Sequence, residues 1–437
     1  MGGFDAGVDA RRCRAPPPPD PLPAWEGGIR VTPTRRLAAL ILLGGVFVME
    51  GFDIAAMSLA VPRLEGALGL APASFGWVFT ALLIGLGAGG ALIAPLGDRF
   101  GRRTLIVAGC FATGLATLGT ATATSIPAFL AWRLATGLAL GACLPNVSAL
   151  SAELAPERLR ATIMAVVSAG IPLGLALAGL LAPPIVAGAG WQGLFLVPGA
   201  AATLLALALW LALEGGAPVH AGGPAKEAAG KLPQLALLRS PWLFPFAVFA
   251  AMLALNALNL YLLNSWLPTV LPGAGLTLDD AARVAGVANL AGLAIGIGAS
   301  ALVDNWRKGP ALMLLFGTMA ASFAAIFLTA PDPLRWTLLL MVGVGGANAG
   351  GMVLPGLAAY LFPARLLSSA VGMGVLVARL GAFAGPPLGA AMLAAGVAPR
   401  TFLGVAALPA LACVVVALAV PAALAVRRKE EPSSNLD

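Results

Sequence analysis

One charged segment reads Gly97-Asp98-Arg99-Phe100-Gly101-Arg102-Arg103 and is the strongest indication of the fold. The chain carries a second version of it 206 residues later, Val303-Asp304-Asn305-Trp306-Arg307-Lys308-Gly309. A second pair of loops has almost the same offset, 207 residues: Ala155-Pro156-Glu157-Arg158-Leu159-Arg160 and Phe362-Pro363-Ala364-Arg365-Leu366-Leu367. Two separate loops that agree on one offset indicate an internal duplication. The sequence therefore predicts two similar halves.

The segments around these loops are apolar. Of the 437 residues, 59% are hydrophobic and only 10% are charged, whereas a soluble domain carries about 25% charged residues. Apolar windows fall at about 37–62, 74–96, 104–124, 127–152, 162–187, 191–213, 242–271, 279–303, 311–330, 334–361, 368–396 and 401–425. A helix needs about 20 apolar residues to cross the hydrocarbon core of a bilayer. We therefore expect an all-α membrane protein with twelve transmembrane helices in two six-helix pseudo-repeats.

The distribution of basic residues predicts the orientation. Of 26 Lys and Arg, 20 lie in segments on the side of the two termini, four on the other side and two within spans. Loops rich in Lys and Arg stay in the cytoplasm. The sequence thus predicts a multi-pass protein of the cell (inner) membrane with both termini cytoplasmic. Such a surface explains the net charge of +7 without a nucleic-acid partner.

The polar stretches predict the boundaries. We expect a disordered cytoplasmic tail over residues 1–34, which holds four consecutive prolines, a six-helix bundle over 35–213 and a glycine-rich cytoplasmic linker over 214–240. A second bundle over 241–426 and a cytoplasmic tail over 427–437 complete the chain.

The duplicated loop has a physical logic. A tight turn between helices favours glycine, here Gly101, and a carboxylate surrounded by arginines can latch two helices through charge-assisted hydrogen bonds. The alternative is that the basic residues only set the topology. The predicted latch comprises Asp98, Arg99, Gly101, Arg102, Arg103, Asp304, Arg307 and Lys308, with Glu153, Arg158 and Arg160 as gate partners.

The pattern of spans and loops, with Arg133, Gly137 and Gly141 in the fourth span, resembles the major facilitator superfamily. Three stretches are similar to its aromatic acid:proton symporter family: Glu50-Gly51-Phe52-Asp53, Leu144-Pro145-Asn146 with the segment 153–162, and the seventh-span segment 256–268. In that family the first position of the Glu50 motif is an aspartate. The resemblance implies the major facilitator fold and uptake of benzoate- or hydroxybenzoate-like acids with protons.

Four charged residues lie clearly within spans: Glu50, Asp53, Arg133 and Arg379. A centred charge costs about 2.5–3.5 kcal/mol on insertion scales, so each is expected to face a cavity or a partner. Counting about 1.5 Å per residue from the span ends matches Asp53 with Arg133 in depth, and Glu50 with Arg379. We expect Asp53, with Glu50, to bind the proton, and Arg379 or Arg133 to bind a substrate carboxylate. Buried structural ion pairs are the alternative.

The seventh span supplies candidate groups for an aromatic ligand: Asn256, Asn259, Tyr261, Asn264 and Trp266. Amides can bind a ring hydroxyl, and aromatic side chains can stack on the ring. Hydrogen bonding between helices is the alternative for the asparagines.

Together these features predict a secondary transporter that imports an organic anion with protons by alternating access, not an enzyme. The chain has no nucleotide-binding loop of the GxxxxGK[ST] form and no Cys/His metal spacing, so we expect no cofactor and no metal, and a monomer that functions in the lipid bilayer. An antiporter or exporter of other organic anions or lipophilic compounds is the alternative within transporters. A non-transporting receptor is the alternative outside them.

Overall fold

The computed structural model describes residues 33–213 and 236–430, and this part of the chain is helical without strands. It contains twelve helices that are long and apolar enough to cross a membrane, which confirms the predicted number of spans. Most of the predicted N-terminal tail, linker and C-terminal tail lies outside the described residues.

The first half of the chain supplies six spans. Its helices are α1 (Pro33–Leu68), α2 (Gly76–Ala88), α3 (Leu96–Phe100), α4 (Arg102–Thr120), α5 (Ile126–Leu154), α6 (Arg160–Ser168), α7 (Gly170–Ala189) and α8 (Gly193–Ala212). A π-helical turn, η2 (Gly89–Ile93), extends α2 to complete the second span, and α6 and α7 together form the fifth.

The second half supplies the other six. Its helices are α10 (Leu243–Val270), α11 (Leu278–Asn305), α12 (Lys308–Leu328), α13 (Pro333–Leu361), α14 (Ala364–Ala394), α15 (Pro399–Val405), α16 (Ala407–Ala417) and α17 (Val420–Glu430). The last three form the twelfth span. Helix α17 continues past residue 427, where we predicted the tail to begin. Arg427, Arg428 and Lys429 sit in its last turn, where positive charge is favourable to the helix dipole.

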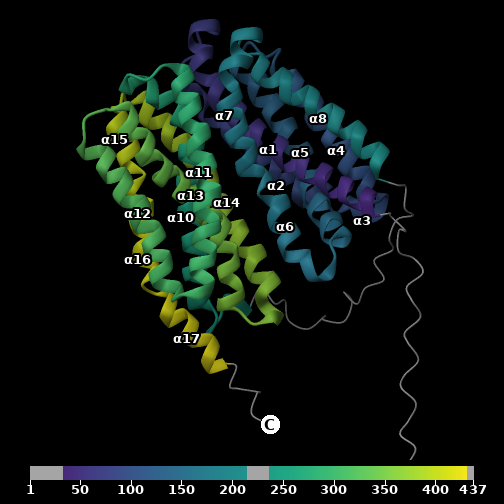
Figure 1. The fold of residues 1–437 in the computed structure, drawn as a ribbon, viewed down its shortest axis with the longest axis vertical. Coiled ribbons are helices and arrows are strands. Elements are labelled where there is room, and N and C mark those ends of the chain that lie inside the picture. The colour runs from purple at the N-terminus through teal and green to yellow at the C-terminus, as the bar shows by residue number, and fades with distance from the viewer. Residues whose placement is uncertain (1–32, 214–235, 431–437) are drawn as a thin grey trace, which may run out of the picture.

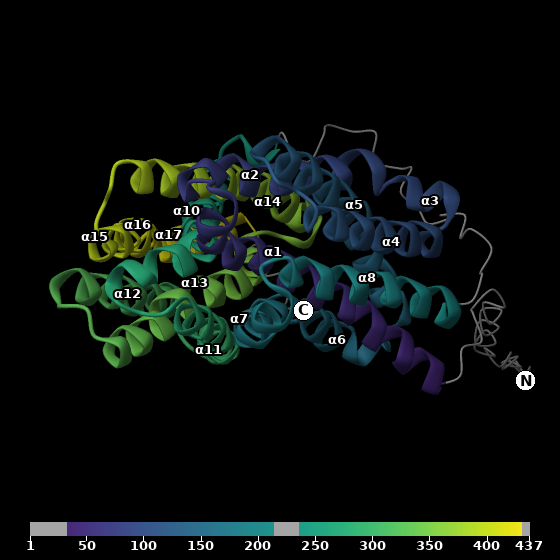
Figure 2. The same ribbon diagram turned by 90° about the horizontal axis from the view of Figure 1, so that it is seen from above.

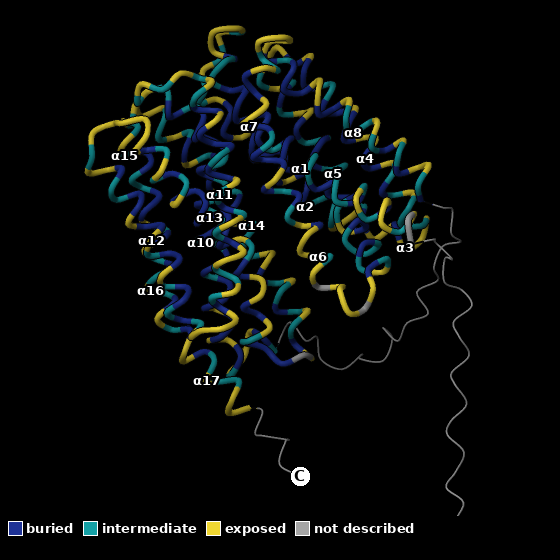
Figure 3. The backbone as a smooth tube through the Cα atoms, viewed as in Figure 1, coloured by how far each residue is buried: buried dark blue, intermediate teal, exposed yellow. Residues whose placement is uncertain are grey.

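Outward-facing side chains are apolar, as lipid requires. On α8, Leu204, Leu207 and Leu211 are 66%, 52% and 68% exposed and repeat along one helix face. Buried residues concentrate inside each half, and exposed residues follow the outer faces and the helix ends (Figure 3). The hydrophobic effect does not drive packing between helices in lipid, so close contact between small residues does so instead.

The two halves lie side by side and touch mainly where α7 meets α11, α2 meets α14, and α1 meets α10 (Figure 2). The face at which α1 begins and α17 ends is called the terminal face here, and the other the opposite face. The α7–α11 crossing is so close that a Cβ at Gly179 would lie 2.5 Å from the backbone nitrogen of Gly286.

Contacts between the halves concentrate toward the opposite face. Arg63, near the end of α1, donates to Asp279 in the first turn of α11 at 2.9 Å. A Cβ at Gly76, the first residue of α2, would lie 2.6 Å from the Cβ of Ala390 near the end of α14. The halves diverge toward the terminal face (Figure 1), so the arrangement is closed at the opposite face and splayed at the terminal face.

Candidate functional site

Helix α1 carries both acidic site residues at mid-span. Gly51 lies between them in sequence, and a Cβ there would lie 2.0 Å from the carbonyl oxygen of Ile171 on α7. Only glycine therefore allows α1 to pack this closely against α7. Because Glu50 and Asp53 are three residues apart, they share a face of α1, and both are buried, at 6% and 2% exposure.

Asp53 forms a closed ion pair with Arg133 of α5. Arg133 donates from Nη1 to Oδ1 at 2.9 Å and from Nη2 to Oδ2 at 2.6 Å, a two-bond arrangement. Its Nη2 also donates to the backbone oxygen of Asp53 at 3.2 Å, and the hydroxyl of Thr117 on α4 donates to Oδ1 at 3.0 Å. The structure therefore brings the depth-matched residues Asp53 and Arg133 into contact, and the pair joins three helices of the first half.

Glu50 is in a different situation. Its Oε2 is buried and has no hydrogen-bond partner among the described residues. Arg379 of α14 and Asp53 are the charges that act on it electrostatically, and Tyr261 of α10 experiences both Glu50 and Arg379. Arg379 is half-buried and has no hydrogen bond or ion pair with any described residue. The second depth-matched pair is thus near enough to interact but open, and it spans the two halves.

Two small cavities of about 10 Å³ lie between the halves. Arg133, Tyr261 and Ser265 line one of them, together with Phe79 and Pro386. Each cavity is about the size that holds a single water molecule. The Asp53–Arg133 pair therefore borders the junction of the halves through Arg133.

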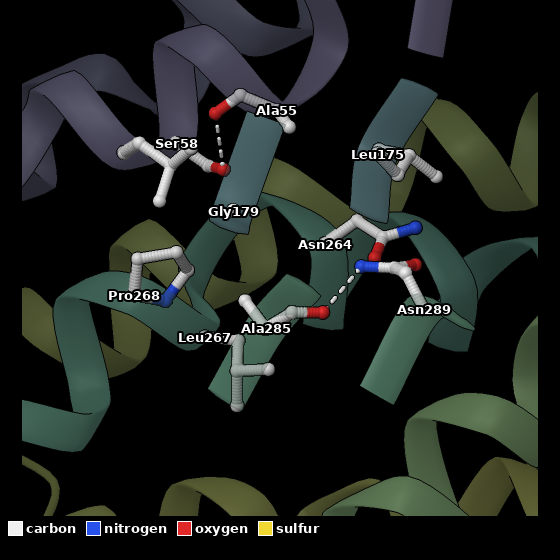
Figure 4. Close-up of a pocket in the computed structure, with 10 residues that line it drawn as sticks. Ala55, Ser58, Leu175, Gly179, Asn264, Leu267, Pro268, Ala285 and Asn289 are labelled. Carbon is white, nitrogen blue, oxygen red and sulfur yellow. Dashed lines mark hydrogen bonds between the residues drawn. The ribbon is translucent and has the colours of Figure 1, made fainter. Parts of the chain in front are cut away.

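The other cavity is polar on one side (Figure 4). Asn264 of α10 and Asn289 of α11 point toward one another there, and Ser58 of α1 lines the cavity from the first half. Ser58 donates to the carbonyl of Ala55, and Asn289 to that of Ala285, so both hydroxyl and amide are held by their own helices.

Three of the predicted ligand residues donate hydrogen bonds within their own half. Asn256 donates to the carbonyl of Ala347 on α13 at 3.1 Å, and Asn259 to that of Ala406, which precedes α16, at 2.8 Å. Trp266 is fully buried, and its indole nitrogen donates to the carbonyl of Pro386 at 2.9 Å. These donors join neighbouring helices, which is the alternative raised above for the asparagines. The ring of Trp266 also packs edge-on against Phe79 of the first half, with centroids 5.2 Å apart. All five residues of this span stay predicted ligand residues.

The first charged loop forms a compact ion cluster at the terminal face. Arg102 forms an ion pair with Glu153 at the end of α5 and lies 3.7 Å from Asp98. Arg103 donates to the carbonyl of Trp210 on α8, and Arg99 lies over the ring of Phe100. Gly101 has φ +91°, the left-handed region that glycine tolerates. This loop links α3, α4, α5 and α8 within the first half.

The second charged loop reproduces this geometry with different chemistry. Lys308 occupies the position of Arg102, and Tyr360 lies 207 residues after Glu153. The Tyr360 hydroxyl donates to Asp304 at 2.8 Å, and the Lys308 ammonium lies 4.4 Å from the centre of the Tyr360 ring. A cation–π contact therefore replaces an ion pair.

The structure does not bring every predicted latch residue into its cluster. Arg158 and Arg160 are exposed and form no ion pair with a described residue, and the same holds for Arg307. They lie at the terminal face, where the halves are apart, so their predicted gate contacts are absent from this arrangement. Across the described residues, no group of three or more His, Cys, Asp or Glu side chains could hold a metal ion.

Two residues of these clusters escaped the sequence analysis. Thr117 follows Thr113 and precedes Thr120 on one face of α4, a polar stripe that marks an inward-facing surface. Tyr360 could have been found by applying the offset of the repeat to Glu153.

Comparison with known proteins agrees with this architecture. Solved structures with the same fold include a bacterial homologue of the human lysosomal transporter Spinster in an inward-facing conformation, with a TM-score of 0.71 at 17% identity over 92% of this chain and all of that one. A D-xylose–proton symporter has a TM-score of 0.71 at 19% identity and covers 89% of this chain and 97% of its own.

Sequence relatives are closer. The 3-(3-hydroxy-phenyl)propionate transporter of Escherichia coli K12 is 32% identical over 92% of this chain and 99% of its own. The 4-hydroxybenzoate transporter PcaK of Pseudomonas aeruginosa is 29% identical over 83% and 86%. The Major Facilitator Superfamily model matches residues 42–372. With its duplicated loops, twelve spans and two six-helix halves, the chain belongs to the Major Facilitator Superfamily of membrane transporters.

Proposed function

We propose that the protein imports aromatic carboxylates together with protons by alternating access. The observation that carries this proposal is the open cluster of Glu50, Arg379 and Tyr261, in which an acid of one half faces a guanidinium and an aromatic ring of the other. A free guanidinium at mid-membrane binds a carboxylate well, since it stays charged and offers paired donors. The ring of Tyr261 suits stacking against an aromatic substrate.

Charge balance in the open cluster provides the coupling. When the cluster holds neither substrate nor a transported proton, ionised Glu50 neutralises Arg379. The halves can then close around the pair. A bound carboxylate without a proton leaves the cluster with one net negative charge, and a proton without substrate leaves it with one net positive charge. Burying a net charge is costly. Only the empty form and the form that carries both substrate and proton can therefore change between the inward-facing and outward-facing states. This gives one proton for each monovalent acid.

The same geometry supports a different role for Asp53 than for Glu50. Its carboxylate already accepts hydrogen bonds from Arg133 and Thr117. We therefore place the transported proton on Glu50 and give the Asp53–Arg133 pair the task of holding α1 against α5 next to the site.

The names of the relatives support the substrate class. Among them are transporters named for 3-(3-hydroxy-phenyl)propionate, 4-hydroxybenzoate and gallate, each an acid with a hydroxylated ring. Asn264 is one turn from Tyr261 on α10 and is the candidate partner for a ring hydroxyl.

The basic terminal face is proposed to be cytoplasmic, in the inner membrane, with both termini on that side, because 20 of 26 Lys and Arg fall there. The splayed halves then open the site to the cytoplasm. The site lies within one chain, so we propose a functional monomer.

Uptake into proteoliposomes tests the proposal. A panel of radiolabelled benzoates, hydroxybenzoates and phenylpropionates is offered under an imposed pH gradient, with and without a protonophore. We expect accumulation that the protonophore abolishes and that a membrane potential alone does not drive, since the loaded carrier moves no net charge. Lack of protonophore-sensitive accumulation of every acid would overturn it, and export driven by an opposite proton flux would favour an antiporter.

A further inference from the structure

A second hollow lies far from the transport site, on the terminal face of the second half. Its volume is about 860 Å³, and it lies between the α11–α12 turn, the end of α13 and the last helix, α17. The lining side chains that matter, called the basic pocket here, are Trp306, Arg307, Lys308, Tyr360, Arg427 and Arg428. We propose that the basic pocket binds the phosphate headgroup of an anionic phospholipid.

The charge of the pocket favours an anion. Four cationic residues and no acidic residue line it, and the Oδ1 of Asp304 in the adjoining turn already accepts the hydroxyl of Tyr360 at 2.8 Å. Arg307 and Arg428 form no ion pair with a described residue. Arg427 donates to the carbonyl of Ala359 and so is held at the rim. Arg307 and Arg428 therefore bring positive charge to the pocket that no ion pair with a described residue neutralises.

The backbone adds to this charge. Helix α12 begins at Lys308 within the pocket, and its N-cap, Arg307, provides no side-chain cap. The free N–H groups of a helix N-terminus and its dipole both favour a phosphate. Cationic side chains and an uncapped helix of 21 residues thus converge on one hollow.

The internal repeat shows how the basic residues of the two loops differ in their partners. In the first half, Glu153 neutralises Arg102. At the equivalent position the second half has Tyr360, which stacks under Lys308 without neutralising its charge. Because a phenol replaces the carboxylate, Lys308 lacks the ion pair that Arg102 has in the first loop.

The location indicates a lipid rather than a soluble anion. Helices α12 and α16 lie on the side of the second half that is far from the first half, and α17 extends from the end of α16 at the terminal face (Figure 1). Trp306 is 49% exposed beside the pocket, and Pro421 and Leu424 of α17 line it as well. An exposed tryptophan at a span end is typical of the headgroup level, and basic pockets on this side of the membrane bind anionic headgroups.

Native mass spectrometry of the purified full-length protein tests this. Phosphatidylglycerol and phosphatidylcholine with identical acyl chains are titrated in detergent, with inorganic phosphate as a soluble competitor. We expect the first phosphatidylglycerol to bind on the order of tenfold more tightly than phosphatidylcholine, and equimolar phosphate not to displace it.

Two variants locate the site. Tyr360→Glu installs the carboxylate of the first half beside Lys308, and the double variant Arg307→Gln/Arg428→Gln removes two charges. Both should bind the two lipids equally, whereas the control Arg158→Gln/Arg160→Gln, which removes two exposed arginines of the first half, should keep the preference. Unchanged preference in both site variants, or no preference in the unmodified protein, would overturn the proposal. Displacement by equimolar phosphate would do so too, by showing a site for a free anion.

Discussion

Two acid–arginine pairs at the centre of the membrane differ in one decisive respect. Asp53 and Arg133 lie in the same half and are closed by two hydrogen bonds, whereas Glu50 and Arg379 lie in different halves and do not touch. The two acids are one helical turn apart. A charge in the membrane can therefore hold the helices of one half together, or it can stay available to a ligand or proton between the two halves. The half to which the partner helix belongs determines which of these applies.

Breaking the closed pair should have the largest effect. Asp53→Asn leaves Arg133 buried at 1% exposure without its anion, and removing one partner of a buried ion pair costs about 3–5 kcal/mol. We expect the free energy of unfolding in detergent to fall by about that amount and transport to fail with it. The matched control is Glu50→Gln, one turn away, which removes no ion pair. Equal destabilisation by the two variants would contradict the distinction.

Neutralising the acid of the open pair should change coupling without unfolding the protein. With Glu50→Gln the cluster cannot exchange a proton, and its empty form keeps the uncompensated charge of Arg379, so we expect net accumulation of substrate under a pH gradient to be lost. Exchange of labelled for unlabelled substrate should continue. Glu65→Gln, an exposed acid on the same helix, is the control and should accumulate normally. Undiminished accumulation by Glu50→Gln would assign the proton elsewhere.

Removing the arginine of the open pair should weaken substrate binding. A hydrogen bond to a charged group contributes about 1.5–3 kcal/mol, so Arg379→Gln should raise the KM for an aromatic acid by roughly 10- to 100-fold. Arg379→Lys should recover part of the lost affinity, because an ammonium keeps the positive charge but cannot form the two parallel hydrogen bonds of a guanidinium. Arg283→Gln, an exposed arginine of α11, serves as control. An unchanged KM would place the carboxylate on Arg133.

Changing the ring beside the open pair should have the smallest effect. Aromatic pairs contribute about 0.5–1.5 kcal/mol beyond area burial, so Tyr261→Leu should raise KM by roughly 2- to 10-fold. Tyr261→Phe keeps the ring and should stay near the unmodified value. If the two variants behaved alike, stacking on Tyr261 would be wrong.

Much of this organisation could be read from local sequence. The spans follow from runs of apolar residues, and Glu50, Asp53, Arg133 and Arg379 stand out because charge is costly in hydrocarbon. The asparagines of α10 show the limit. The residue spacing predicts a surface that points into the protein, which leaves open whether its amides serve a ligand or other helices, and in the structure the amide nitrogens of Asn256 and Asn259 donate to α13 and to Ala406. Spacing alone cannot tell which neighbour occupies that side of a helix.

Local sequence is enough to predict the twelve spans, the duplication and the basic terminal face, because each depends on residues close together in the chain and on their transfer between water and lipid. Only the tertiary structure decided which charges meet. Asp53 reaches Arg133 across 80 residues, and Glu50 faces Arg379 from the other half. Such pairings depend on how separate helices pack through small residues such as Gly51 and Gly179, and no local pattern encodes that packing.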